Sequence, residues 1–480
     1  MLAKILKVKL LKNIKDSASS HLELIGLIAC LSLLTGCSSL SGPDYVRPDS
    51  PVKTQWSETK PGKGQAIEKD WWKNFGDPYL DGLVAKTIAD NIDIKVLAAR
   101  IGLAEDTISQ VNAGRLPVVD AAFGGDFRKR SGGSFGTSYG LATALNWEID
   151  IWGKLKKGVE AQEAEYKATE ADWRAGYLTI VSAVASTYFQ IRQLDEQINQ
   201  QQGALEKNQK ILSILQALYA EGMLANTTVL QQSAEVNRLN RELLELNRFR
   251  KITENTLATL QGIPAGDFSV SPGKLSDLIN LVDVPAGLPS DLLDRRPDIV
   301  AAEYRVIRAH DFAGQAKLAL LPTVSLTGQG GNTSVELTDV LKAWSYGFSP
   351  SIDLPFLDPG VHARIDVTKA QAELSKEEYR STVIKAFEEV ENALVNLANH
   401  KQQRTELQER LEKLRRVSQQ ISAQLEEGIV SQLEVFESER SLLAAELALL
   451  QNHQQILADT VGLYKALGGG WPKENFADAS

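Results

Sequence analysis

The chain has 480 residues, a formal net charge of −9 and two cysteines. An acidic chain does not suit nucleic acid, whose phosphates require a basic surface. The histidines are scattered without metal-ligand spacing, and no G-x-S-x-G motif surrounds a serine. Composition and motifs therefore predict neither an enzyme nor a metal site, and they exclude nucleic acid as a partner.

The first 36 residues have the features of a secretory signal peptide. Lysines are frequent at the start, Leu24–Leu34 is an apolar run, and Leu34-Thr35-Gly36-Cys37 follows. This last segment resembles the lipobox of bacterial lipoproteins, which implies cleavage before Cys37 and lipidation of its thiol. Ser38 then favours transport to the outer membrane. We expect residues 37–84 to be a lipidated segment on the outside of the fold, and the lipid to be the only attached group.

The rest of the chain is a tandem repeat, which is best sought before any other feature because it fixes the architecture. Asp93-Ile94 matches Asp298-Ile299, and Leu116-Pro117 matches Leu321-Pro322, each at an offset of 205 positions. The register drifts slightly by Glu221-Gly222, which matches Glu427-Gly428. The repeats are predicted at 85–285 and 286–470, with a tail at 471–480.

Each repeat is predicted to begin with a helix and to continue with two strands. The strands are expected at about 118–128, 139–151, 323–330 and 343–354. In 139–151, bulky residues such as Leu141 and Trp147 alternate with small or polar ones such as Ala142 and Glu148. Alternation with aromatic residues on the outer face is typical of transmembrane β-strands. No run of 18 apolar residues follows Cys37, so a membrane crossing would use these strands.

A long helical hairpin is predicted after each pair of strands, at 154–261 and 361–461. Val361–Glu427 contains neither proline nor glycine, and as one helix it would be about 100 Å long. Gly222 and Gly428 interrupt the two rods and are the predicted hinges of the hairpin tips. Ser431 and Glu434 have the spacing of a capping box at the next helix.

Four strands cannot close a barrel, and lipid does not tolerate an open sheet edge. The chain is therefore expected to oligomerise. Three copies would supply twelve strands, and the rods would continue the lumen for about 100 Å. This predicts a mainly α-helical chain with membrane β-strands that forms a conduit.

Four segments together resemble the TolC-type outer-membrane efflux family, in its NodT-like lipoprotein branch associated with resistance–nodulation–division (RND) pumps. They are Pro43–Pro48, Trp71–Pro78, Asn146–Gly153 and Leu293–Ile299. The resemblance implies a homotrimer with a 12-stranded barrel, a helical periplasmic tunnel and a tip that closes like an iris. It also implies a periplasmic membrane-fusion adaptor and an inner-membrane RND pump as partners, with the duct passing small molecules outwards.

The same resemblance assigns the candidate site to the second hairpin. Glu434 and Glu437 match the family's pair of acids at the narrowest constriction, and a trimer would bring six carboxylates together. Such rings attract cations and repel anions. The first repeat has Thr228 and Gln231 at these positions. The alternative is that the two acids form a solvated helix start, where the helix dipole favours negative charge.

Two other functions remain open. One is an exit duct for type I protein secretion, which is a channel with another partner and cargo. The other is a coiled-coil scaffold lipoprotein tethered to the outer membrane without a pore. The scaffold explains the lipobox and the rods, but it does not explain two strand pairs at matching places in the repeat.

Overall fold

The computed structural model describes residues 45–49, 53, 55–57, 67–129, 131–133, 135–275, 284, 287, 289–342 and 344–471. The predicted signal peptide, Cys37 and all but the first residue of the predicted tail lie outside these residues. The chain divides into two compact units. One contains Leu103–Lys167 and Glu303–Glu378, and the other contains Asp49–Gly102, Ala168–Ala302 and Tyr379–Ser480. Each unit therefore draws on both sequence repeats.

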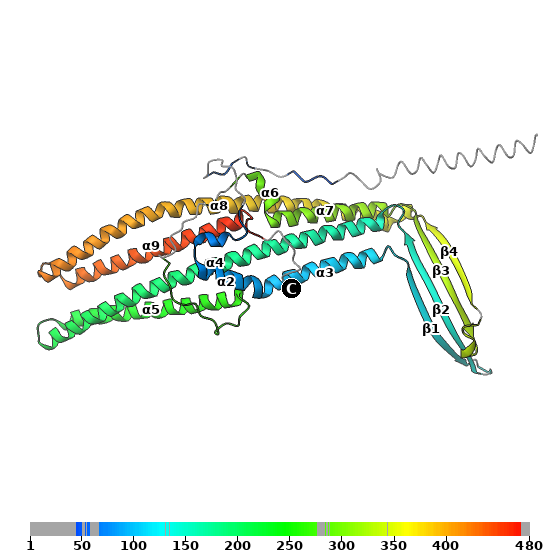
Figure 1. Ribbon diagram of the computed structural model, residues 1–480. Helices are drawn as coiled ribbons and strands as arrows, with labels where there is room; N and C mark the ends of the chain where they lie inside the picture. Colours follow the sequence, from blue (N-terminus) through cyan, green and yellow to red (C-terminus); the bar gives the residue numbers. More distant parts are fainter. Residues whose placement is uncertain are drawn as a thin grey trace, which may run out of the picture. The chain divides into compact units, whose positions relative to one another are not determined.

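The first unit contains a four-stranded antiparallel sheet within the described residues (Figure 1). Its strands are β1 (Val118–Lys129), β2 (Phe135–Ile149), β3 (Thr323–Ser334) and β4 (Ser345–Asp353). The strand order is β1-β2-β3-β4, so that β2 and β3 join the two repeats and β1 and β4 are the edges. Each edge strand has one side without a partner strand in the described chain.

All four predicted strands exist, but their ends differ from the expected ranges. β2 begins at Phe135 rather than 139, because its ladder with β1 continues to the pair Lys129–Phe135. It ends at Ile149 rather than 151, because the Asp150 carboxylate turns to accept the Leu155 and Lys156 N–H groups at the start of the next helix. β3 extends to Ser334 rather than 330, because Ser334 and Thr333 still pair with Tyr139 and Gly140 of β2.

The register gives the sheet two different faces. Bulky apolar residues dominate one face, among them Phe123, Phe127, Leu145, Trp147 and Phe348. Glycine, alanine, serine and threonine dominate the opposite face, and this face also carries acidic side chains. The first is called the outward face and the second the inward face. This is the alternation that a strand needs between lipid and a polar lumen.

Two long helical hairpins follow the strand pairs. Hairpin 1 consists of α4 (Lys154–Ala220) and α5 (Asn226–Leu260), and hairpin 2 consists of α8 (Pro359–Glu426) and α9 (Gln432–Ala466). The 67 residues of α4 make a helix of about 100 Å. In the second unit the two helices of each hairpin lie side by side (Figure 1). None of the helices in the described ranges is apolar enough over sufficient length to cross a membrane.

The shorter helices depart from the predicted single helix before each strand pair. In the first repeat there are two, α2 (Pro78–Asp90) and α3 (Ile92–Ala113). They are separated at Asn91, whose side-chain oxygen accepts the Ile94 N–H at 2.9 Å and so starts a new helix. In the second repeat, α6 (Leu292–Arg295) precedes α7 (Pro297–Leu318).

The N-terminal segment contributes an aromatic core to the second unit. The short helix η2 (Trp71–Phe75) buries Trp71, Trp72 and Phe75. Trp71 stacks on Tyr464 of α9 with ring centroids 4.9 Å apart. A side chain at Gly470 would lie 2.1 Å from the Trp71 ring, and φ there is +84°. Gly470 therefore lets the backbone that follows α9 approach this core.

Arg296, within the Leu293–Ile299 segment, joins three elements of the second unit. Its guanidinium is buried, donates hydrogen bonds to the Ala466 and Ala386 carbonyl oxygens at 3.1 and 3.3 Å, and pairs with Asp298 at 2.9 Å. Ala466 is the last residue of α9, where free carbonyls favour a cation. The segment therefore fixes the end of hairpin 2 against the start of α7.

Candidate functional site: the hairpin tips

Both hairpins turn through the same backbone motif. Gly222 and Gly428 each have φ of +74°. The N–H groups of Met223 and Ile429 bond carbonyl oxygens five residues earlier at 2.9 Å, and those of the two glycines bond three residues earlier. This is the Schellman motif, which requires a left-handed residue after the helix and favours glycine there. The structure thus places both predicted hinge glycines at the turns.

Glu434 lies in the first turn of α9, where it completes the predicted capping box. Its carboxylate accepts the Ser431 N–H at 2.7 Å and the Ser431 hydroxyl at 3.3 Å. Hairpin 1 has Ala225 at the corresponding cap position, with no side-chain hydrogen bond. Glu434 therefore also fits the alternative interpretation, in which it is an acid at a helix start. Its side chain remains exposed.

Glu437 lies one turn further along α9 and is also exposed. Its carboxylate forms an ion pair with Arg440, and both side chains are about half exposed. Glu434 and Glu437 are three residues apart, so that they share one helix face. The structure brings the two predicted residues together on one face near the tip, with Glu437 partly neutralised by its neighbour.

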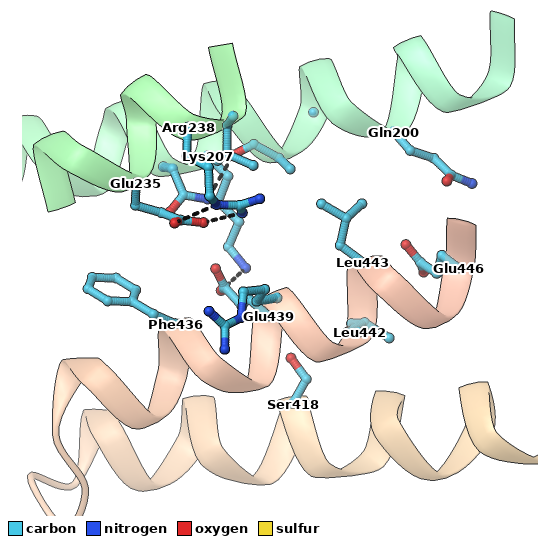
Figure 2. A pocket seen from close by; sticks show the side chains of 15 residues that line it. Gln200, Lys207, Glu235, Arg238, Ser418, Phe436, Glu439, Leu442, Leu443 and Glu446 are labelled. Carbon is cyan, nitrogen blue, oxygen red and sulfur yellow. Dashed lines mark hydrogen bonds and ion pairs between the residues drawn. The ribbon is translucent and has the colours of Figure 1, made fainter. Parts of the chain in front are cut away.

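A groove lies between the two hairpins a few turns from the tips (Figure 2). Lys207 of α4 and Glu439 of α9 form an ion pair across it. Arg238 of α5 binds Glu235 and Glu242 at 2.5 and 2.8 Å. The hydrogen bond from Arg238, with a smaller contribution from the charge of Arg440, lowers the pKa of the Glu235 carboxyl from its ordinary 4.5.

This ionic cluster was not predicted from the sequence. The spacing of Glu235, Arg238 and Glu242 on one helix could have indicated it, because residues three and four apart are neighbours. The pairing of Lys207 with Glu439 could not have been found in this way. It depends on how two hairpins from different repeats pack.

The N-terminal segment is fixed to the first unit a few residues after the predicted lipidation site. Arg47 donates two hydrogen bonds to Glu303 of α7, at 2.8 and 2.7 Å, and the Tyr45 hydroxyl donates to the same carboxylate at 3.3 Å. Cys37 itself lies outside the described residues. The eight residues from Cys37 to Tyr45 span at most about 28 Å.

The described residues contain no group of three or more histidine, cysteine, aspartate or glutamate side chains placed to hold a metal ion. A sheet with one apolar face, continued in sequence by long solvated helices, defines a channel-forming membrane protein.

The family model described as outer membrane efflux protein matches residues 83–263 and 288–469, and the chain belongs to this family. The pyoverdine export outer membrane protein OpmQ of Pseudomonas aeruginosa is 29% identical over 464 residues, covering 94% of this chain and 97% of that protein. The cation efflux system protein CusC of Escherichia coli O6:H1 is 30% identical over 452 residues, covering 92% and 98%.

A solved structure agrees with this assignment. The outer-membrane channel OprN has a TM-score of 0.80 at 29% identity, covering 90% of this chain and 99% of that one. The predicted TolC-type fold class, outer-membrane location and role as an efflux exit duct are confirmed. The family consists of channels, which confirms that the chain is not an enzyme and disfavours the scaffold without a pore.

Proposed function

We propose that three copies of the chain form one exit duct of a tripartite efflux system, in which small solutes leave through a common twelve-stranded barrel. The open edges of the sheet carry this proposal. β1 and β4 each have an unpaired side in the described chain, which lipid does not tolerate, so that β1 of one copy pairs with β4 of the next. Two copies would already supply eight strands, and the choice of three follows the family resemblance.

Native mass spectrometry in detergent, combined with conductance in planar bilayers, tests this assembly. A trimeric mass with discrete channel openings is the expected result. A monomeric mass with no conductance, even in variants whose tip residues are substituted to open it, would contradict it.

Each tip carries exposed apolar side chains, and these support docking of a periplasmic adaptor that connects the duct to an inner-membrane RND pump. Met223 and Leu230 are exposed in hairpin 1, and Ile429 and Leu433 in hairpin 2. Apolar side chains gathered at the end of a polar rod favour a protein contact. Ile429→Asp should abolish cross-linking of the tip to the adaptor in cells, whereas Ile214→Asp, at an exposed position about two turns from the tip of hairpin 1, should not. Equal cross-linking in both variants would contradict tip docking.

The carboxylates of Glu434 and Glu437 form the constriction in this proposal. Three copies bring six of them around one axis, and such a ring favours cations. Gly222 and Gly428 serve as the hinges of the tips. The tip opens when hairpin 2 moves away from hairpin 1, which breaks the Lys207–Glu439 ion pair. Glu439→Gln should therefore raise the open probability of the channel, and Glu409→Gln, which removes an exposed carboxylate within α8, should leave it unchanged.

Lipidation of Cys37 anchors the N-terminus, and the contacts of Arg47 with Glu303 keep the anchor close to the first unit. No other attached group or cofactor is needed for passive conduction. Intact mass of the protein from the outer membrane should include the lipid and lose it in Cys37→Ser. A variant that still carried the mass of the lipid would contradict lipidation at this residue.

Export of small solutes is favoured over type I protein secretion by the relatives, whose names refer to export of pyoverdine and efflux of cations. Deletion of the chain should lower resistance to a toxic solute of the cognate pump. Loss of a secreted protein with unchanged solute resistance would favour the alternative.

A further inference from the structure

The outward face of the sheet carries a single charge within the described strands. Phe123, Phe127 and Lys129 of β1 alternate with inward residues, and the pair Lys129–Phe135 shows that this lysine shares the outward face with Phe135. The other outward positions of β1 to β4 are apolar, glycine, or uncharged polar residues. The remaining charged residues of the described strands all lie on the inward face, namely Asp120, Asp126, Arg128, Glu148 and Asp353.

Lys129 is placed where the apolar band ends. It is exposed, it is the last residue of β1, and it lies about 7 Å beyond Phe127 along the strand. Phe127 contacts Tyr139 edge to face, with ring centroids 6.1 Å apart, and the Lys129 ammonium lies 6.0 Å from the Phe135 ring centroid. Aromatic girdles mark the membrane interface in such sheets.

The direction of the strands identifies which interface this is. β1 and β2 meet at a short connection after Lys129, whereas their other ends lead into α3 and α4. The long helices are solvated and belong on the periplasmic side, so that the connection between β1 and β2 lies on the opposite side of the membrane. Phe127 pairs with Thr137, and Thr137 and Trp147 are ten positions apart on β2, or about 34 Å along the strand. At a strand tilt of about 40° this is about 26 Å of height, which matches an apolar band of about 25 Å.

A cation at this depth lies beside lipid headgroups. A lysine on the lipid face is costly at the centre of a membrane but nearly neutral at the interface. No carboxylate shares the outward face of the described strands, so that the charge has no counter-ion on that face of the sheet. By contrast, Arg128 on the inward face has Asp126 at 2.6 Å.

We propose that Lys129, with the Phe127–Tyr139 and Phe135 rings beside it, binds the phosphate of a phosphorylated glycolipid in the outer leaflet. The rings contact the acyl chains while the ammonium binds the headgroup phosphate. This inference rests on the proposed barrel, and in a trimer it gives three equivalent lipid sites at the outer rim. It adds a lipid-binding role to a sheet that otherwise only encloses the pore.

Native mass spectrometry of the detergent-solubilised protein tests the proposal with lipid A that carries two phosphates. The expected result is that the wild type and Arg128→Gln retain bound lipid A, whereas Lys129→Gln binds it about fivefold more weakly, as expected for one cation near an anionic lipid surface. Arg128→Gln is a matched control, because it removes the neighbouring cation from the opposite face.

Two further probes separate the lipid from its parts. Dephosphorylated lipid A should bind wild type and Lys129→Gln equally, and inorganic phosphate alone should not compete with lipid A. Equal binding of phosphorylated lipid A by the wild type and Lys129→Gln would overturn the proposal, as would an equal loss in Arg128→Gln. Oligomeric mass and conductance are recorded for each variant. If the pore is intact and Lys129→Gln binds lipid A as the wild type does, the lipid site alone is refuted. If the wild type itself shows no oligomeric mass, the proposed barrel is refuted.

Discussion

The two hairpins have nearly the same backbone and different chemistry. Their helices have 67 and 35 residues in hairpin 1 and 68 and 35 in hairpin 2, and both turn through a Schellman motif. Hairpin 1 buries polar side chains between its helices and has an uncapped tip helix. Hairpin 2 also buries polar side chains, among them Ser438 and Asn452, but it has a capped tip helix with two exposed carboxylates. The two hairpins thus share helix lengths and a turn motif, while the exposed carboxylates at the tip belong to hairpin 2.

The largest expected difference concerns the interior of the hairpins. Gln232 of α5 is fully buried and donates to the Asn208 carbonyl and side-chain oxygens at 2.8 and 3.0 Å. Gln232→Ala removes both hydrogen bonds and leaves a cavity, at a cost of about 2–3 kcal/mol. Ser438, at the matching position of hairpin 2, is buried with no hydrogen-bond partner for its hydroxyl in the described structure. Ser438→Ala should be nearly neutral in the same thermal unfolding measurement, and equal losses in the two variants would refute this contrast.

The turns are where the hairpins should behave alike. Nothing lies within 4 Å of a side chain added at Gly222 or Gly428, so that a substitution meets only the backbone cost of positive φ. Gly222→Ala and Gly428→Ala should each destabilise the local turn by about 1–2 kcal/mol. Amide hydrogen exchange at the two tips measures this directly. A much larger effect at one tip would mean that a contact outside the described chain constrains it.

The caps should differ between the two hairpins. Ser431→Ala removes the hydroxyl half of the capping box of α9, while the Ser431 N–H can still donate to Glu434, and it should cost about 1 kcal/mol, seen as faster amide exchange in the first turn. Ala225→Ser introduces a capping hydroxyl before α5, where none exists, and should slow exchange there. No change in either variant would show that the capping box contributes nothing at the tip.

The smallest expected effect depends on pH. The Arg238 hydrogen bond lowers the pKa of Glu235, so that its contribution to stability is complete above the ordinary value of 4.5 and is lost as pH falls through the lower value of the folded protein. Glu235→Gln should therefore slightly reduce the fall in melting temperature as the pH is lowered through this window. Hairpin 2 has Ser441 at the matching position, and Ser441→Ala should leave the pH profile unchanged. A profile unaltered by Glu235→Gln would contradict the assigned ion pair.

Local sequence patterns predict most of the helices and their turns. The tip ends of the rods follow from the sequence to within a few residues, because Gly222 and Gly428 adopt the positive φ that ends each helix there. Glycine alone is not sufficient, since α4 continues through Gly158, Gly176 and Gly203. The capping box of Ser431 and Glu434 is likewise confirmed, because both partners lie within four residues. The break at Asn91 was missed, although an asparagine that caps Ile94 is a local signal.

Contacts between distant segments could not be predicted. The ion pair of Lys207 with Glu439 and the bonds of Arg296 to Ala386 and Ala466 depend on packing between segments far apart in the chain. The candidate acids follow from the family resemblance alone. Their partners, Ser431 for Glu434 and Arg440 for Glu437, show how each carboxylate is held.

The most direct test of the role of hairpin 2 is the reversal potential of single channels across a potassium chloride gradient. We expect that the wild type prefers cations and that the double variant Glu434→Gln/Glu437→Gln loses most of this preference. Glu245→Gln is the matched control, because Glu245 pairs with Arg248 at the same i, i+3 spacing on hairpin 1, away from the tip. It should retain the wild-type selectivity. An unchanged reversal potential in the double variant would contradict the assignment of the constriction to Glu434 and Glu437.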